Sequence, residues 1–131
     1  MALFQGLAHV AIYTKNMEES IAFYEKLGGR TLDRAEMPGN KLLALVDFCG
    51  VVLELVQFPG GVTELEGCIS HFAIAVEDVD AAAKLFADAG VESFETPETT
   101  VLPSLFGGLD NRFFKGPSGE RIELLHMHHG N

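Results

Sequence analysis

The sequence predicts an α+β fold made of two copies of one strand–helix–three-strand module. Residues 7–28, "LAHVAIYTKNMEESIAFYEKLG", match residues 69–90, "ISHFAIAVEDVDAAAKLFADAG", at an offset of 62 with no gap. Each copy begins with alternating apolar residues and then changes to helical spacing. Three further strand-like stretches follow each helix. Two half-sheets of this kind, each covered by a helix on one face, can pair so that the remaining faces avoid water.

The first copy begins with a strand and continues as a helix. In "GLAHVAIY", residues 6–13, alternate side chains share a face, and the face of His9 also carries the small residue Ala11. In "NMEESIAFYEKLG", Asn16 and Glu19 have the spacing of a capping box, and the final glycine is typical of a helix C-terminus. The stretches "GRTLDRAEM", "KLLALVDFC" and "VVLELVQF" then predict three strands.

The second copy has the same order of elements. It predicts a strand at residues 69–76 and a helix at residues 79–90, with Asp78 as the N-cap. The three strands expected after this helix are "VESFETPE", "DNRFFKG" and "ERIELLHM". Residues 96–110 are predicted as a loop much longer than its counterpart in the first copy, and loops of such length are often lids or binding loops.

The repeat also predicts the domain organisation. We expect one domain over residues 1–131, in which modules at residues 5–58 and 67–128 are joined by a linker at residues 59–66. Neither module can bury both faces of its sheet alone, so the two are expected to fold as a pair.

The composition limits the function classes. Nineteen acidic against nine basic residues give a net charge of −10, which disfavours nucleic acid as a partner. No apolar run approaches the roughly 20 residues of a membrane span, and the first residues do not resemble a signal peptide, so the expected location is cytoplasmic. Cys49 and Cys68 share no metal-binding spacing and are expected to be buried or half-buried thiols.

Four polar residues interrupt the apolar strand pattern at matching positions. His9 matches His71 in the first strand of each module, and Glu54 matches Glu123 in the last strand at an offset of 69. Taken singly, a histidine is more often a satisfied core residue, and Glu54 has an ordinary alternative on a solvent-facing strand edge. Together, two neutral imidazoles and two carboxylates match the charge of a divalent cation such as Zn, Ni, Co, Mn or Fe. The absence of thiolate ligands favours an open catalytic site over a closed structural zinc site.

Two basic residues precede the "GPSG" turn of the second module. Arg112 and Lys115 are candidates to meet an anionic substrate, although solvated side chains are the commoner case for both residue types.

The quoted segments, together with "VVLELVQ" and "NRFFKGPSGERIELL", closely resemble the vicinal oxygen chelate superfamily of glyoxalase I, bleomycin-resistance proteins and extradiol dioxygenases. The resemblance covers about residues 7–127. "FFKGPSGERIEL" is similar to the closing signature of the family, an aromatic residue, Asp-Pro-x-Gly and Ile-Glu-Leu, except that Gly116 stands where aspartate is usual.

The resemblance implies a cupped, barrel-like mixed sheet that binds one divalent metal per site. It carries the role of metal ligand onto His9, Glu54, His71 and Glu123. This set resembles that of glyoxalase I (lactoylglutathione lyase), with Ni, Zn, Co or Mn favoured over Fe. Related dioxygenases generally use two histidines and one glutamate, methylmalonyl-CoA epimerases usually have glutamine at the position of Glu54, and bleomycin-binding members lack the metal.

The same resemblance implies a reaction. Glyoxalase I isomerises the hemithioacetal of methylglyoxal and glutathione, and its metal stabilises an enediolate formed by proton transfer. Glu123 is the first choice for the residue that moves the proton, and Glu54 is the second.

Two positions depart from the glyoxalase I pattern. Tyr13 stands where an arginine helps to hold glutathione, and Phe58 stands where an asparagine does so. Tyr13 is therefore a candidate substrate contact, and a more apolar carbonyl or hydroxy compound becomes an alternative to the glutathione adduct. The resemblance further implies a homodimer. The other open functions are an Fe(II) extradiol-type dioxygenase and a non-catalytic binding or resistance protein.

Overall fold

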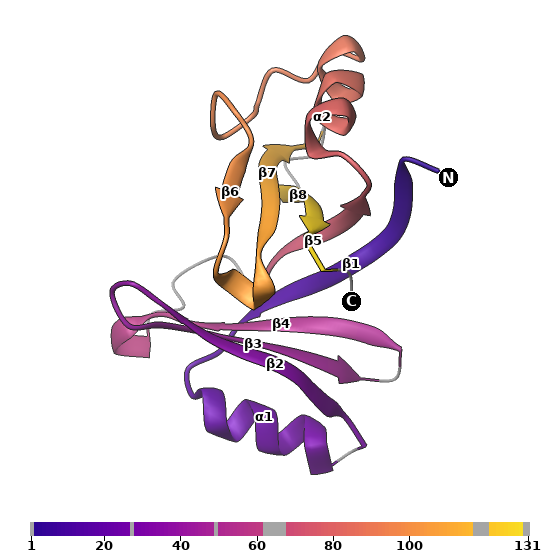
Figure 1. The fold of residues 1–131 in the computed structure, drawn as a ribbon. Helices are drawn as coiled ribbons and strands as arrows, with labels where there is room; N and C mark the ends of the chain where they lie inside the picture. The colour runs from indigo at the N-terminus through magenta and orange to yellow at the C-terminus, as the bar shows by residue number, and fades with distance from the viewer. Residues whose placement is uncertain (1, 27, 49, 62–67, 117–120, 130–131) are drawn as a thin grey trace. The chain divides into compact units, whose positions relative to one another are not determined.

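The computed structural model describes residues 2–26, 28–48, 50–61, 68–116 and 121–129. Each half of the chain has the order strand, helix and three strands, which confirms the predicted α+β fold (Figure 1). The first half contains β1 (Phe4–Tyr13), α1 (Met17–Lys26), β2 (Arg30–Met37), β3 (Lys41–Phe48) and β4 (Val51–Gln57). The second half contains β5 (Ile69–Val76), α2 (Val79–Asp88), β6 (Thr100–Leu102), β7 (Leu109–Lys115) and β8 (Arg121–Met127).

The chain divides into two compact units. The first unit is His9–Ser70, and the second unit is Met1–Ala8 with His71–Asn131. In the first unit the strand order is β2-β3-β4-β1, and β1 runs parallel to β4. In the second unit the order is β5-β8-β7-β6, and β5 runs parallel to β8. The other strand pairs within each unit are antiparallel.

Both helices begin and end as their local sequence predicts. The side chain of Asn16 accepts a hydrogen bond from the N–H of Glu19 at 3.1 Å, and Asp78 accepts one from the N–H of Ala81 at 3.0 Å. These contacts satisfy N–H groups that have no partner within the helix. Gly90 follows α2 with φ 108°, a backbone conformation that glycine adopts without a steric penalty.

In the first unit, α1 packs on one face of its strands (Figure 1). Met17 and Ile21 of α1 are buried against Ala44 and Val46 of β3 and Leu55 of β4. Because side chains alternate along a strand, the neighbours of these strand residues lie on the opposite face, away from α1.

In the second unit, α2 packs on β7 and β8 in the same way. Val79 and Ala82 of α2 share a buried cluster with Phe114 of β7 and Leu124 of β8. The helix-free face of this unit has a smaller buried cluster, which includes Ala73. Among the described residues, each unit therefore has one helix-covered face and one face without a helix.

The strand predicted at residues 91–98 is absent, and the predicted loop at 96–110 contains β6 and a 3₁₀ turn at Leu105–Gly107. The reason is that the side chain of Arg112 occupies backbone acceptors of this segment, bonding the carbonyls of Thr96 and Pro97 at 3.0–3.2 Å. Proline also lacks an N–H for a strand ladder.

The prediction of a buried or half-buried thiol is wrong for Cys68, which is exposed just before β5. Cys49 lies outside the described residues, as do most of the predicted linker and most of the "GPSG" turn. Within the described part of the chain, no helix has both the length and the apolar character needed to span a membrane.

Candidate metal centre

Each unit places one histidine and one glutamate on neighbouring parallel strands. In the first unit Ala11 of β1 is opposite Glu54 of β4, and in the second unit Ala73 of β5 is opposite Glu123 of β8. The two ladders therefore have the same register, although the strands are separated by different lengths of chain. In each case the histidine precedes the alanine by two residues and shares its face.

The pair in the first unit is His9 and Glu54. Nε2 of His9 lies 3.4 Å from Oε1 of Glu54, and the side chains are 5% and 13% exposed. Glu54 is adjacent in sequence to Leu55, which packs against α1, so the carboxylate lies on the helix-free face of this unit.

The pair in the second unit is His71 and Glu123. Nε2 of His71 lies 3.0 Å from Oε1 of Glu123, and both side chains are 6% exposed. The other carboxylate oxygen, Oε2, accepts a hydrogen bond from Nδ2 of Asn111 at 3.0 Å. Both oxygens of Glu123 thus have a defined neighbour within the second unit.

Phe113 and Arg121 extend this second pair. The ring of Phe113 contacts the ring of His71 edge-on at 5.0 Å, and the guanidinium of Arg121 lies 3.9 Å from the centre of the Phe113 ring. Arg121 also donates two hydrogen bonds of 2.8 Å to Glu95, which lower the pKa of that carboxyl below its usual value. Phe113 thus packs against His71, and Arg121 packs on Phe113 while its charge is paired with that of Glu95.

The sequence predictions did not include Asn111, Phe113 or Arg121 as site residues. The signal was present in "DNRFFKG" and "ERIELLHM", since alternate residues of an antiparallel hairpin share a face. The register pairs Phe113 directly with Glu123, and Asn111 is two residues further along β7. The alternation alone does not show which of these residues lie beside Glu123. That requires the register of β7 and β8.

The spacing of the donor atoms fits a divalent cation. Two ligand atoms that each lie about 2.1 Å from one ion are about 3.0 Å apart at a right angle and about 3.4 Å apart at the tetrahedral angle. The two nitrogen–oxygen distances, 3.0 and 3.4 Å, agree with these values, and the shorter one is also an ordinary hydrogen-bond distance. Imidazole nitrogen with carboxylate oxygen is also a donor combination that Zn, Ni, Co, Mn and Fe accept.

Tyr13 lies on the same face of β1 as His9. Its hydroxyl accepts a hydrogen bond from Oγ of Ser70 at 3.0 Å, and its ring contacts the ring of Phe58 at 5.4 Å. Lys41 lies 5.0 Å from the centre of the Phe58 ring. The two residues that depart from the glyoxalase I pattern therefore contact each other, and together they are an aromatic surface within the first unit.

Arg112 and Lys115 occupy different positions from Glu123. Arg112 lies on the helix-covered face of β7, where its guanidinium is 4.2 Å from the centre of the Phe94 ring. Lys115 is exposed at the end of β7, and its N–H donates to Oγ of Ser93 at 3.1 Å. The structure thus brings Asn111 to the His71–Glu123 pair and places Arg112 on the other side of the strand.

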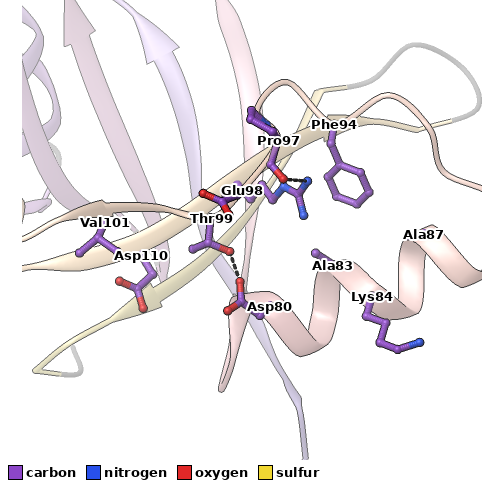
Figure 2. A pocket seen from close by; sticks show the side chains of 11 residues that line it. Asp80, Ala83, Lys84, Ala87, Phe94, Pro97, Glu98, Thr99, Val101 and Asp110 are labelled. Carbon is purple, nitrogen blue, oxygen red and sulfur yellow. Dashed lines mark hydrogen bonds between the residues drawn. The ribbon is translucent and has the colours of Figure 1, made fainter.

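Arg112 instead borders a pocket of about 560 Å³ beside α2 (Figure 2). Figure 2 shows Thr99 bonded to Asp80 across this pocket, with Lys84 further along α2. The lining residues are Asp80, Ala83, Lys84, Ala87, Phe94, Pro97, Glu98, Thr99, Val101, Asp110 and Arg112. The pocket lies on the face of β7 opposite Asn111, so it is separate from the His71–Glu123 pair.

Solved structures with the same fold include enzymes of different types. The methylmalonyl-CoA epimerase from Mycobacterium tuberculosis is 20% identical with a TM-score of 0.78, and the alignment covers 96% of this chain and 90% of that chain. A glyoxalase I variant from Zea mays is 14% identical with a TM-score of 0.65, covering 95% and 44%. A catechol 2,3-dioxygenase is 20% identical with a TM-score of 0.57, covering 94% and 43%. At these identities the similarity shows a shared fold and does not assign a reaction.

The family assignment comes from the sequence. No curated protein matches it significantly. Residues 6–124 match the family described as the Glyoxalase/Bleomycin resistance protein/Dioxygenase superfamily, and that span contains all four predicted metal ligands. The chain therefore belongs to the glyoxalase/bleomycin resistance protein/dioxygenase superfamily.

Proposed function

We propose that this protein is a divalent-metal-dependent lyase or isomerase of the glyoxalase I type, which moves a proton between neighbouring carbons of a small carbonyl substrate. The observation that carries the proposal is the buried histidine–glutamate pair that occurs in the same register on the helix-free face of both units. Members of the superfamily typically bind a divalent metal, and the donor spacing of each pair is suited to one.

In this proposal both pairs serve a single cation, with His9, Glu54, His71 and Glu123 as ligands. Ni, Zn, Co and Mn suit this donor set, and a catalytic metal site keeps an open position for water or substrate beside its protein ligands. When bound, the cation supplies Lewis acidity that stabilises negative charge on the substrate oxygens as a neighbouring carbon loses its proton.

The protein residues divide the remaining work. The two histidines act as neutral ligands whose orientation is fixed by burial and, for His71, by the Phe113 ring. One glutamate, Glu123 or Glu54, removes the proton from carbon and returns it to the adjacent carbon. The nearly complete burial of both pairs excludes bulk water, which strengthens electrostatic interactions there.

The first unit bears on the substrate class. Tyr13 and Phe58, whose rings contact each other, stand where the glyoxalase I pattern has an arginine and an asparagine that help to hold glutathione. We therefore propose a carbonyl or hydroxy compound with an apolar group as the substrate, and the methylglyoxal–thiol hemithioacetal is the reference compound against which it is tested. Epimerisation beside a carbonyl is also a proton removal and return, so the similarity to an epimerase is consistent with the same class of chemistry.

The test of this function is hydrogen exchange in heavy water. Protein loaded with Ni²⁺, Zn²⁺, Co²⁺ or Mn²⁺ is incubated with methylglyoxal and several thiols, and with thioesters that carry an acidic α-hydrogen, and NMR follows deuterium incorporation at carbon. Metal-dependent exchange that is lost in His71→Ala is the expected result. Ligand-dependent stabilisation without exchange would instead indicate a binding protein, and catechol cleavage by the Fe²⁺-loaded protein would indicate a dioxygenase.

We further propose that the protein acts as a homodimer, as related two-module proteins commonly do. Light scattering measures the oligomeric state directly. Mixing His9→Ala with His71→Ala protein restores metal binding only if the two pairs of one site come from different subunits, because one site of the mixed dimer then keeps all four ligands. A monomer, or a mixture that stays inactive, would place the four ligands in a single chain.

A further inference from the structure

We propose that the pocket beside α2 is a second ligand site, which takes a small zwitterion of the class of amino acids and short peptides. The pocket has a volume of about 560 Å³, within the range of ordinary small-molecule sites. It lies in the second unit on the helix-covered face of β7 (Figure 2). Glu123 lies on the other face of the same sheet, so this inference does not depend on the proposed metal chemistry.

The helix-covered faces of the two units differ at this place. The registers of the two hairpins make Ala44 of β3 the counterpart of Arg112 in β7. They likewise make Leu42 the counterpart of Asp110. Ala44 and Leu42 both belong to the apolar cluster that packs against α1. A guanidinium and a carboxylate therefore stand in the second unit where the first unit has apolar side chains, and charged groups on such a face are costly unless they have partners.

The wall that α2 contributes leaves space for a ligand. At the offset of 62 residues, Ala83 is the counterpart of Ile21, which is buried in the core of the first unit. Ala87, one turn further along α2, also lines the pocket with only a methyl group. Residues 94–101, most of which are not in a strand, supply another wall. The second unit thus has a hollow where the first unit has a larger side chain.

Arg112 supplies a positive group with a donor left over. Its Nε and Nη2 donate to the carbonyls of Thr96 and Pro97, and the guanidinium carbon lies 4.2 Å from the centre of the Phe94 ring. These partners are uncharged. Within the described part of the chain, no carboxylate pairs with Arg112 and its Nη1 has no hydrogen-bond partner. A carboxylate of the ligand would provide both the countercharge and the acceptor.

Three acidic side chains of the pocket, those of Asp80, Glu98 and Asp110, are suited to an ammonium group. Asp80 accepts a hydrogen bond from the hydroxyl of Thr99. Oδ1 of Asp110 lies 2.8 Å from Nε2 of His128. Glu98 is exposed, and the described residues include no partner for its carboxylate. The pocket can therefore offer carboxylate oxygens to a cationic group.

The two signs of charge lie on different sides of the pocket. Figure 2 shows Asp80 and Asp110 on one side and Phe94, the ring beside Arg112, on the other. Lys84, the other basic residue of the lining, is exposed and forms an ion pair along its own helix. A ligand that carries a carboxylate and an ammonium joined by apolar carbons matches this arrangement, and amino acids and short peptides have these groups.

The test is a titration of the full chain with leucine and with the dipeptide leucyl-leucine, followed by calorimetry and by amide-resolved NMR. N-Acetyl-leucine lacks the ammonium group and leucinamide lacks the carboxylate. Each should bind at least about 10-fold more weakly than leucine, because each loses its charge-assisted hydrogen bonds. Tighter binding of the dipeptide than of leucine would identify short peptides as the ligand, and the reverse order would identify free amino acids.

Substitutions locate the binding in this pocket. Glu98→Gln should raise the Kd for leucine about 3-fold, the effect of one exposed charge. Glu92→Gln is the matched control, because it removes the same charge at an exposed position outside the lining and should leave the Kd unchanged. His71→Ala should also bind leucine with the wild-type Kd, which separates this site from chelation of leucine by a metal ion.

The expected NMR result is a set of saturable shifts in residues 80–87 and 94–101. The absence of saturable binding for leucine and for the dipeptide would overturn the inference. So would equal affinity for leucine and its two derivatives, or an equal Kd in Glu98→Gln and wild type. Since metal content is measured separately, each of these results leaves the proposed function standing, and a protein without metal leaves this inference standing.

Discussion

Nε2 of His71 and Oε1 of Glu123 lie 3.0 Å apart, a hydrogen-bond distance that also suits two ligands of one cation. The other histidine–glutamate pair has the looser distance of 3.4 Å and the same strand register. Both pairs lie on helix-free faces. Substitution of each glutamate therefore tests whether its pair binds a metal ion.

Glu123→Gln should weaken metal binding more than any other glutamate substitution. The variant replaces an anionic ligand by a neutral amide within a nearly buried pair, so we expect Co²⁺ affinity to fall at least about 10-fold. Calorimetric titration of the metal-free protein measures this. Equal affinity in wild type and variant would show that Glu123 is not a ligand.

Glu54→Gln should separate catalysis from metal binding. If Glu54 moves the proton, kcat falls by about 10²–10⁴-fold, the usual contribution of general acid–base catalysis, while most of the metal is retained. Deuterium exchange and metal content are measured on the same sample. Full exchange in this variant would assign the proton-transfer role to Glu123 and would indicate an epimerase-like site, in which glutamine is tolerated at this position.

Asp78→Ala should destabilise the second unit through helix α2. Its carboxylate accepts the N–H of Ala81, and loss of such a cap costs about 1 kcal/mol, or a decrease in Tm of about 3–6 °C for a domain of this size. Asp88→Ala is the control, since its ion pair with Lys84 is exposed and contributes little. Thermal unfolding followed by circular dichroism that gives equal Tm changes for both variants would contradict the assigned cap.

Glu95→Gln should alter the pH dependence of stability. The hydrogen bonds from Arg121 lower the pKa of Glu95 in the folded protein below 4.5, the ordinary value. The contribution of the Arg121–Glu95 pair to the free energy of unfolding is therefore present above about pH 4.5. It is lost as the pH falls through the lower pKa of Glu95 in the folded protein. Since the pair is one-third exposed, we expect about 1 kcal/mol or less near neutral pH.

Urea unfolding of wild type and Glu95→Gln, near pH 7 and again well below pH 4.5, measures this difference. The exposed Glu92 is the matched control, because Glu92→Gln removes the same charge three residues away. A stability difference between Glu95→Gln and wild type that persists undiminished at low pH would show that ionisation of Glu95 is not its source.

The elements predicted correctly are those set by short-range signals. The capping roles of Asn16 and Asp78 depend on residues three positions away, and the first strand of each module is marked by its own alternation. The equivalence of Glu54 and Glu123 could also be predicted from the sequence, because the last strand of each module carries the same Glu-Leu pattern. Local chemistry and internal repetition were enough for these features.

The features that were missed depend on long-range contacts. Residues 91–98 have the composition of a strand, but Arg112, at least 15 residues away, bonds the carbonyls of Thr96 and Pro97. The contact of Asn111 with Glu123 likewise depends on the hairpin register of β7 and β8, which the single sequence does not specify. Cys68 is exposed although its neighbours in sequence are apolar or small, because burial is decided by packing and not by composition.

The most direct test of the proposed metal centre is elemental analysis of untagged, extensively dialysed protein, with His9→Ala and His71→Ala prepared in parallel. The account predicts one Ni, Zn, Co or Mn ion per chain in the wild type and loss of that ion in both variants, because each unit supplies half of the ligands. Wild-type protein that holds no metal, even after each ion is added back, or a variant of either histidine that keeps the full metal content, would contradict it.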